Sequence, residues 1–207
     1  MPTYGESYFN ANAAGVIDPG GYSELQRPTW SPDDTTDDAL KAKHRRLWNQ
    51  FSSQIQGKRV LELGPGYGYM IQDFIEFGHD PANILGVEFS QYAFDNKVVS
   101  QMILEDGPGF ISNILPNQWD VVIGLRFLPC IINDGTITAM LNSIKTRTDF
   151  GIFSIDANES YAGQALIDMQ SVYNMKDFSE WQSILDIPNA DFRAELVPQE
   201  DEYGAFA

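Results

Sequence analysis

Residues 60–68 read Val60-Leu61-Glu62-Leu63-Gly64-Pro65-Gly66-Tyr67-Gly68, a short apolar run followed by three glycines within five positions. The apolar run predicts a buried strand, and apolar residues at helical spacing begin at Met70 and stop at Gly78. Glycine permits a tight turn and lets the backbone lie against a ligand with no side chain between them. A strand, a glycine turn and a helix in this order predict a ligand-binding turn in an α/β domain.

The spacing of the glycines distinguishes two classes of ligand. A dinucleotide fold needs Gly-x-Gly-x-x-Gly, because the pyrophosphate must reach the N-terminus of the helix. Here Gly64 and Gly66 are followed by Gly68, and the position that a dinucleotide requires holds Tyr69. A tyrosine there would crowd a pyrophosphate, whereas S-adenosylmethionine has no phosphate and needs only a close approach of the backbone. The spacing therefore favours this methyl donor over NAD.

A carboxylate supplies the second signal. Glu88 ends the next predicted strand, within Gly86-Val87-Glu88-Phe89-Ser90, and lies 24 positions after Gly64. An acid at this place can accept hydrogen bonds from both hydroxyls of a ribose, and it repels the 2′-phosphate of NADP. Taken alone, Glu88 would be an ordinary solvated carboxylate. Combined with the glycine turn at this interval, it indicates a site for a nucleoside.

Strands and helices alternate along the rest of the chain. The alternation predicts an α/β fold with a doubly wound, mainly parallel seven-stranded sheet and helices on both faces. The last two strands are close enough in sequence to form an antiparallel pair, which fits a methyltransferase better than a dehydrogenase. Helices are expected over residues 35–56, 70–77, 91–99, 137–144, 161–173 and 178–185, and strands over 59–63, 84–87, 101–104, 121–125, 150–155, 192–197 and 203–207.

From Gly57 onward the chain resembles the class I (Rossmann-like) S-adenosylmethionine-dependent methyltransferases, most closely in residues 60–68 and 86–90. The resemblance implies that Glu62 and the glycine turn hold the methionine end of the donor, and that Glu88 holds its ribose. It also implies an acid or amide near the adenine amino group, for which Glu105 and Asp106 are equal candidates. The residues expected to bind S-adenosylmethionine are Glu62, Gly64, Pro65, Gly66, Tyr67, Gly68, Glu88, Phe89, Glu105, Asp106 and Gly124.

The chain departs from the family after the fourth strand. Many members that act on small molecules have Leu-Glu-His-Ile there, whereas residues 128–131 are Leu-Pro-Cys-Ile. The Asn/Asp-Pro-Pro-Tyr/Phe signature of enzymes that methylate bases is also missing, since residues 124–127 are Gly-Leu-Arg-Phe. The carboxyl ends of the strands are still expected to present Arg126, Phe127, Asp156 and Asn158 to an acceptor. The catalytic residues stay unknown, and the weak candidates are Arg126, Asp156, Tyr8 and His44.

Two parts of the chain are expected. Residues 1–56 form an N-terminal arm and helix on the acceptor side, and residues 57–207 form the donor-binding domain. In the arm, Tyr4 and Tyr8 either fold over the donor as a lid or pack on the domain or on a second subunit. The basic run 41–46 is interpreted as a solvated helix face, and His79 as a residue of a surface loop.

The formal net charge of −16 comes from 29 acidic and 13 basic residues. Such a surface repels phosphate backbones and anionic lipid, so we expect a small-molecule acceptor and neither a nucleic acid nor a membrane as partner. A single cysteine and two isolated histidines predict no metal site. With no apolar run of membrane-spanning length and no secretory signal, a cytoplasmic location is expected.

These observations predict an enzyme that transfers a methyl group from S-adenosylmethionine to oxygen or nitrogen of a small molecule, by in-line displacement. Two alternatives stay open. The first is a non-catalytic donor-binding partner or regulatory domain, because the Glu-His pair of many relatives is missing. The second is a nicotinamide-dependent oxidoreductase, against which Tyr69 and the closing strand pair both argue.

Overall fold

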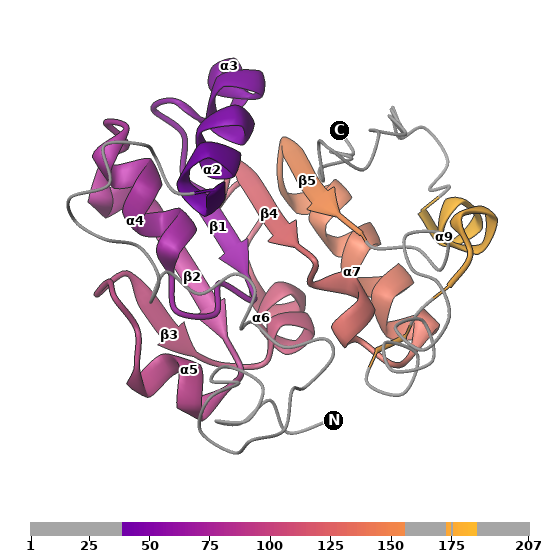
Figure 1. Ribbon diagram of the computed structural model, residues 1–207. Coiled ribbons are helices and arrows are strands. Elements are labelled where there is room, and N and C mark those ends of the chain that lie inside the picture. The colour runs from indigo at the N-terminus through magenta and orange to yellow at the C-terminus, as the bar shows by residue number, and fades with distance from the viewer. Residues whose placement is uncertain (1–38, 156–172, 175, 186–207) are drawn as a thin grey trace.

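A computed structural model describes residues 39–155, 173–174 and 176–185, and within them five parallel strands form one sheet in the order β3-β2-β1-β4-β5 (Figure 1). The central strand β1 pairs with β2 on one side and with β4 on the other. The strand order therefore reverses at β1, which is the switch point of a doubly wound sheet. The strands are β1 (Val60–Leu63), β2 (Ile84–Glu88), β3 (Met102–Leu104), β4 (Val121–Leu125) and β5 (Phe150–Ser154).

Helices cover both faces of the sheet, and each face has its own apolar core (Figure 1). On one face, Val60 and Ile123 join the buried side chains of α2, α3 and α4; on the other, Leu61 and Val122 join those of α6, α7 and α9. Successive residues of β1 thus point to opposite faces. No helix in the described part of the chain is long and apolar enough to cross a membrane. The helices are α2 (Ala39–Gln50), α3 (Ser52–Ile55), α4 (Tyr69–Glu76), η2 (Pro81–Asn83), α5 (Gln91–Asp95), α6 (Gly107–Asn113), η3 (Leu128–Cys130), α7 (Asp134–Arg147) and α9 (Phe178–Leu185).

Three helices that follow strands begin with a side-chain cap. Ser90, Asp106 and Asn133 each accept a hydrogen bond from the backbone N–H three residues later, at 3.2, 2.9 and 3.0 Å respectively. These bonds satisfy amide groups that a helix start would otherwise leave without a partner. They fix where α5, α6 and α7 begin, and thereby fix the loops at the carboxyl edge of the sheet.

Most of the predicted elements are confirmed within the described residues. The first five expected strands are present with ends that differ by at most one residue, and α9 has the expected limits. The expected long N-terminal helix is interrupted at Phe51, and α5 ends at Asp95, four residues early. Helix α6 was missed because Gly107, Pro108 and Gly109 are poor helix formers, although the Asp106 cap initiates it. The sixth and seventh strands, which form the antiparallel pair, and the helix at 161–173 lie outside the described residues.

The interpretation of His79 as a surface residue was wrong. The side chain is only 4% exposed, and its ring meets the edge of Trp48 at a centroid distance of 5.9 Å. Its Nε2 lies 3.3 Å from the carbonyl oxygen of Asn83, and burial lowers the pKa of the imidazole. His79 therefore belongs to the core between α4 and the start of β2, away from the carboxyl edge of the sheet.

The basic run at 41–46 is only partly solvated, since Arg45 and Arg46 are exposed whereas Lys41 is partly buried and His44 is buried. Lys41 forms an ion pair of 2.6 Å with Glu76 on α4, while Arg45 is exposed and places its guanidinium 4.2 Å from the centroid of the Phe77 ring. Lys41 and Arg45 therefore both contribute to the contact between α2 and the end of α4.

Candidate functional site

The turn after β1 brings backbone amide groups to the switch point of the sheet. Gly64, Gly66 and Gly68 have φ angles of 68°, 58° and 84°, a region that side-chain-bearing residues rarely adopt. The Gly68 N–H donates to the carbonyl of Pro65 at 2.9 Å, and Gly68 then serves as the N-cap residue of α4. Open α/β sheets bind their ligands outside the carboxyl ends of the strands at such a point.

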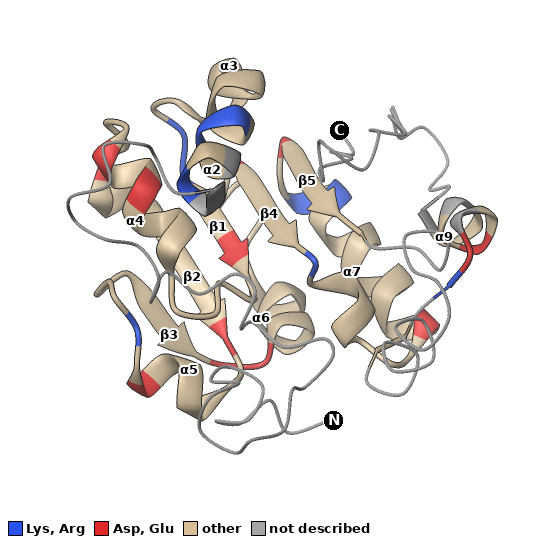
Figure 2. Ribbon diagram, in the orientation of Figure 1, with Lys and Arg blue, Asp and Glu red and all other residues tan. Residues whose placement is uncertain are grey.

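Glu88 joins the end of β2 to this turn. Its Oε2 accepts a hydrogen bond from the Gly66 N–H at 2.8 Å, and its Oε1 accepts one from the Ser90 N–H at 2.7 Å. The side chain is only 2% exposed, and burial raises its pKa to about 7 despite the N–H groups that lower it. Figure 2 shows acidic residues on each of the neighbouring strands β1 and β2. Glu88 thus lies against the glycine turn.

Glu62 is a second buried acid, on the central strand. It is 4% exposed, and its Oε2 has no hydrogen-bond partner. Burial raises its pKa to about 8, and the carboxylates of Glu88 and Asp73 add to that shift. A buried polar atom without a partner is costly, and a cation beside it would both satisfy the oxygen and favour its ionised form. These two acids and the glycine turn therefore fit S-adenosylmethionine, which carries an ammonium, a sulfonium and a ribose.

The loop after β3 is tied to the same place. The Glu105 N–H donates to the carbonyl oxygen of Glu88 at 2.9 Å. This hydrogen bond holds the loop after β3 beside the end of β2. The side chain of Glu105 is exposed, whereas Oδ2 of Asp106 accepts the capping bond from Gly109. Of the two acids, Glu105 is the more accessible. Which of them meets an adenine stays a prediction.

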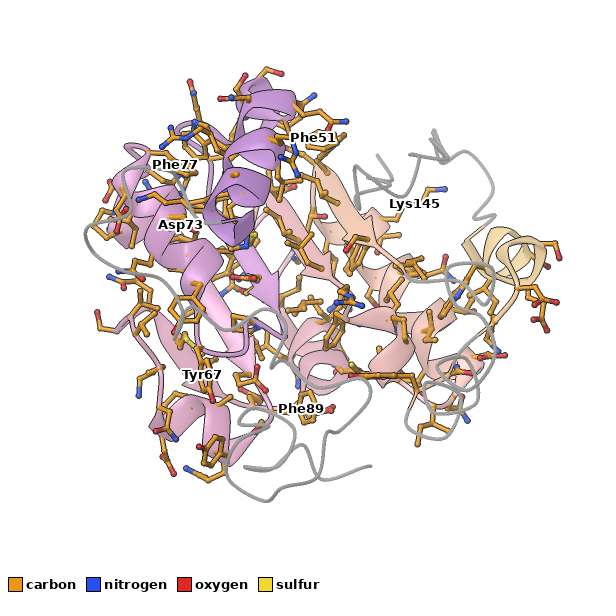
Figure 3. The ribbon with its side chains drawn as sticks, in the orientation of Figure 1. Phe51, Tyr67, Asp73, Phe77, Phe89 and Lys145 are labelled. Carbon is orange, nitrogen blue, oxygen red and sulfur yellow. The ribbon has the colours of Figure 1, made fainter. Side chains whose placement is uncertain are left out.

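Aromatic side chains surround the carboxyl ends of β1 and β2. Tyr67 and Phe89, both expected to bind the donor, lie beyond these strand ends (Figure 3). The rings of Tyr67 and Tyr69 meet edge to face, with centroids 6.0 Å apart. Aromatic faces suit a sulfonium cation and an apolar acceptor. The cluster consists of Tyr67 and Ala93, with Tyr69, Phe89, Tyr92, Cys130 and Tyr173 packed against them.

His44, a catalytic candidate from the sequence, is buried between α2 and α4. Its Nδ1 lies 2.6 Å from Oδ2 of Asp73, and the two side chains are 6% and 0% exposed. Asp73 was missed in the sequence; Figure 3 shows it where α4 faces α2. The pair joins these helices and brings a third carboxylate to the surroundings of Glu62. This contact gives His44 a structural role, and its role as a base stays a prediction.

Arg126 and Phe127 both follow β4, but only one of them is exposed. Arg126 is exposed and has a φ of 53°, whereas Phe127 is 4% exposed and belongs to the core beneath α6 and α7. The expectation that Phe127 faces an acceptor was therefore wrong, because the left-handed turn at Arg126 directs its ring inward. Gly124 is buried in β4, where an added Cβ would lie 2.7 Å from the Phe153 ring. Tyr4, Tyr8, Asp156 and Asn158 lie outside the described residues.

Methyltransferases are among the solved structures to which this chain is similar. WbdD, a bifunctional kinase-methyltransferase, matches with a TM-score of 0.61 and 15% identity over 88% of this chain and 37% of its own. An S-adenosylmethionine-dependent methyltransferase from Archaeoglobus fulgidus matches with a TM-score of 0.57 and 15% identity over 74% of this chain and 69% of its own. The plantazolicin methyltransferase BamL, in complex with S-adenosylhomocysteine, matches with a TM-score of 0.53 and 14% identity over 72% and 62%.

The fold is that of the class I S-adenosylmethionine-dependent methyltransferases. At identities of 14–15% this likeness is one of fold. The chain spans at most 42% of the WbdD chains that it matches. No protein-family model and no curated protein matches the sequence. In this methyltransferase fold, the glycine turn, Glu62 and Glu88 meet at the switch point of the sheet.

Proposed function

We propose that this protein is an S-adenosylmethionine-dependent methyltransferase that acts on oxygen or nitrogen of a small molecule. The observation that carries the proposal is the pairing of two buried acids at the glycine turn. Glu88 accepts a hydrogen bond from the Gly66 N–H at 2.8 Å, and the buried Oε2 of Glu62 has no hydrogen-bond partner. A nucleoside that carries positive charge matches both features, whereas a dinucleotide would bring negative charge to two carboxylates.

Each part of the donor has a proposed set of protein contacts. Glu62 accepts hydrogen bonds from its ammonium group, and the turn from Gly64 to Gly68, Pro65 included, lies against the methionine end. Glu88 accepts from the ribose hydroxyls, and Tyr67 and Phe89 give apolar contact. Glu105 or Asp106 accepts from the adenine amino group. Arg126, at the exposed end of β4, is proposed to face the acceptor.

S-adenosylmethionine supplies a methyl group on a positively charged sulfur. The acceptor oxygen or nitrogen attacks the methyl carbon with a lone pair, in line with the bond that breaks, and the carbon–sulfur electron pair stays on sulfur. An acceptor that carries a proton then loses it to water or to a base. The chain's main contribution is to hold both partners together in a site that excludes water. A small acceptor is proposed because the net charge of −16 opposes polyanions.

Titration calorimetry tests the donor first. The full chain is titrated with S-adenosylhomocysteine, with NAD as the competing ligand and Glu88→Ala as the variant. Micromolar binding of S-adenosylhomocysteine that Glu88→Ala weakens, with no heat from NAD, supports the proposal. Binding of NAD alone would favour an oxidoreductase, and binding of neither ligand would remove the functional claim.

A non-catalytic donor-binding domain is the second candidate. The residues after β4 form η3, in which Leu128 and Pro129 are buried, and this segment contains neither an acid nor a histidine. Both histidines of the chain are buried elsewhere. A panel of phenols, amines and carboxylic acids, assayed for S-adenosylhomocysteine production, separates the two candidates. Donor binding without turnover on any of them would favour the partner or regulatory domain.

A further inference from the structure

The turn that leaves β4 has a backbone conformation that glycine usually provides. Arg126 has a φ of 53°, in the left-handed region, where a long side chain is uncommon. Its N–H is held by β5, since it lies 3.0 Å from both the carbonyl oxygen and the Oγ of Ser154. The next residue, Phe127, has a φ of −81° and is the N-cap residue of η3. The backbone therefore changes direction at Arg126, and the Phe127 side chain is buried in the core.

The ring of Phe127 lies between two loops that leave different strands. A Cβ added to Gly64, in the turn after β1, would lie 2.7 Å from Cδ2 of the ring. A Cβ added to Gly107, at the start of α6 after β3, would lie 2.7 Å from Cζ of the same ring. Because an added Cβ would lie so close, the backbone already touches the ring at both glycines. Gly64 lies beside Cδ2, and Gly107 lies beside Cζ. Phe127 therefore sets the separation of these loops.

We propose that Phe127 is a positioning residue for the methyl donor, spacing the glycine turn from the loop after β3 so that both can hold one ligand. The inference rests on the proposed function, under which the turn holds the methionine end and the loop after β3 meets the adenine. Phe127 itself is 4% exposed, and its proposed effect on the ligand is exerted through Gly64 and Gly107. A phenyl ring suits this role because it is rigid and has two side-chain torsions.

The proposal differs from ordinary core packing in what it predicts for ligands of different length. S-adenosylhomocysteine reaches from one loop to the other, so a change in their spacing strains its binding. 5′-Deoxy-5′-methylthioadenosine has the adenine, the ribose and the thioether but lacks the amino-acid end. It needs only one of the loops together with Glu88, so the spacing matters less to it. A residue that merely stabilises the domain would affect both ligands equally.

The chain offers a matched control in Phe153 on β5. Phe153 is 5% exposed, close to the 4% of Phe127, and its ring also touches a glycine, since a Cβ on Gly124 would lie 2.7 Å from it. Its glycine neighbours are Gly151 and Gly124; Gly124 was expected from the sequence to bind the donor, but it lies within β4, so Phe153 reaches neither the turn after β1 nor the loop after β3 through them. Phe153→Leu therefore removes a buried ring of similar environment without changing the spacing of those loops.

The test compares Phe127→Leu and Phe153→Leu by calorimetry with both ligands, and by urea unfolding. We expect Phe127→Leu to lower the affinity for S-adenosylhomocysteine by roughly tenfold to a hundredfold, because small displacements of bound groups are costly. The affinity of this variant for methylthioadenosine should fall by no more than about threefold. Phe153→Leu should change the affinity for either ligand by no more than about threefold. Both variants should lose similar stability. If Phe127→Leu does not fold, Phe127→Met keeps a flexible side chain of similar volume and takes its place.

Two results would overturn the inference while leaving the proposed function intact. In the first, Phe127→Leu binds S-adenosylhomocysteine as Phe153→Leu does. In the second, Phe127→Leu weakens both ligands by the same factor, which would make the ring a general packing residue. Failure of the unmodified chain to bind S-adenosylhomocysteine would instead overturn the proposed function, and this inference with it.

Discussion

The Gly66 N–H donates to Oε2 of Glu88 at 2.8 Å, so the acid at the end of β2 fixes the turn at the end of β1. The other carboxylate oxygen is used by the Ser90 N–H, at the start of α5. One side chain thus ties together two strand ends and a helix start before any ligand is bound. A ribose at this carboxylate would meet a group that is already oriented, and such preorganisation reduces the entropic cost of binding.

Replacing Glu88 should affect both stability and donor binding. In Glu88→Gln the amide NH₂ must face one of two backbone N–H groups, so one buried donor is left without an acceptor. We expect a loss of about 1–3 kcal/mol in the free energy of unfolding. Binding of S-adenosylhomocysteine should weaken by roughly tenfold to a hundredfold, because hydrogen bonds to a charged group are lost. Urea unfolding and calorimetry measure the two effects.

The control for this prediction is Asp95→Asn. Asp95 ends α5 and is exposed, and its carboxylate accepts a hydrogen bond from the nearby Gln91 at 2.8 Å. Its replacement removes the same charge from the helix that follows β2 and should leave donor affinity unchanged. If Asp95→Asn lowers the affinity for S-adenosylhomocysteine as much as Glu88→Gln does, the effect is one of net charge, and the ribose contact is not supported.

The buried acid Glu62 should make the ligand-free protein less stable as pH rises. In the unfolded chain Glu62 has its ordinary pKa of 4.5, whereas in the fold burial raises that pKa to about 8. Between these values the unfolded state releases the proton and the folded state keeps it. The contribution is therefore fully present below pH 4.5 and is lost as pH rises to about 8. Its limiting slope is about 1.4 kcal/mol per pH unit for one group.

The variant Glu62→Gln isolates this contribution, since it keeps the shape of the side chain and cannot ionise. Unfolding free energies at several pH values between 5 and 8 are compared with those of the unmodified chain, the window being set by the two pKa values. The difference between the proteins should grow with pH in favour of the variant. His79 and Glu88 also titrate, but they are present in both proteins. Parallel curves would show that Glu62 is ionised in the fold at all these pH values.

Donor binding should release a proton from Glu62. An ammonium group beside the unpartnered Oε2 favours the carboxylate, so the pKa falls from about 8 when the ligand binds. Affinity for S-adenosylhomocysteine should therefore rise between pH 6 and 8, by at most about tenfold per pH unit. Calorimetry in buffers of different ionisation enthalpy measures the protons released. A release that is the same in Glu62→Gln would assign the proton to another group, Glu88 first.

The order of the elements was predictable because each strand is a short apolar run and each turn has its own signal. The same rule failed at α6, where a Gly-Pro-Gly start is a poor helix sequence and the Asp106 cap supplies what it lacks. Phe127 shows a different limit. Nothing local indicates that Arg126 adopts a left-handed φ of 53°, since that conformation depends on Ser154 of a strand far along the chain.

The candidate site was predictable where residues at a fixed spacing along the chain indicate one function. It was not predictable where it depends on how two helices pack together. The glycine turn and Glu88 could be read from spacing alone, and the structure brings them into contact. His44 and Asp73 each carried a signal that we did not use. Each is a polar residue on the apolar face of its helix. His44 is three residues before Leu47, and Asp73 is three residues after Met70. Two polar residues on facing apolar stripes predict a buried pair, but only once the helices are known to pack together.

The buried pair of His44 and Asp73 should contribute more to stability than an exposed pair between the same helices. His44→Ala leaves a fully buried carboxylate without this partner, and we expect a loss of about 3–5 kcal/mol. Lys41→Ala breaks the 2.6 Å pair with Glu76, whose side chain is 43% exposed, and should cost about 0–1 kcal/mol. Urea unfolding measures both. Adding Asp73→Asn to His44→Ala should recover part of the loss, and a loss from His44→Ala no larger than that from Lys41→Ala would contradict the buried pair.

The close approach of Gly64 to Phe127 can be separated from backbone strain, because Gly57 has the same conformation in open surroundings. Gly57 and Gly64 have φ angles of 69° and 68°, but an added Cβ meets nothing within 4 Å at Gly57 and the Phe127 ring at 2.7 Å at Gly64. Gly57→Ala should cost about 1 kcal/mol from strain alone. Gly64→Ala should cost about 1–3 kcal/mol more, because the ring must move within a packed core. In a Phe127→Ala background that excess should disappear, since the space is then free; an excess that persists in urea unfolding would place the obstruction elsewhere in the turn.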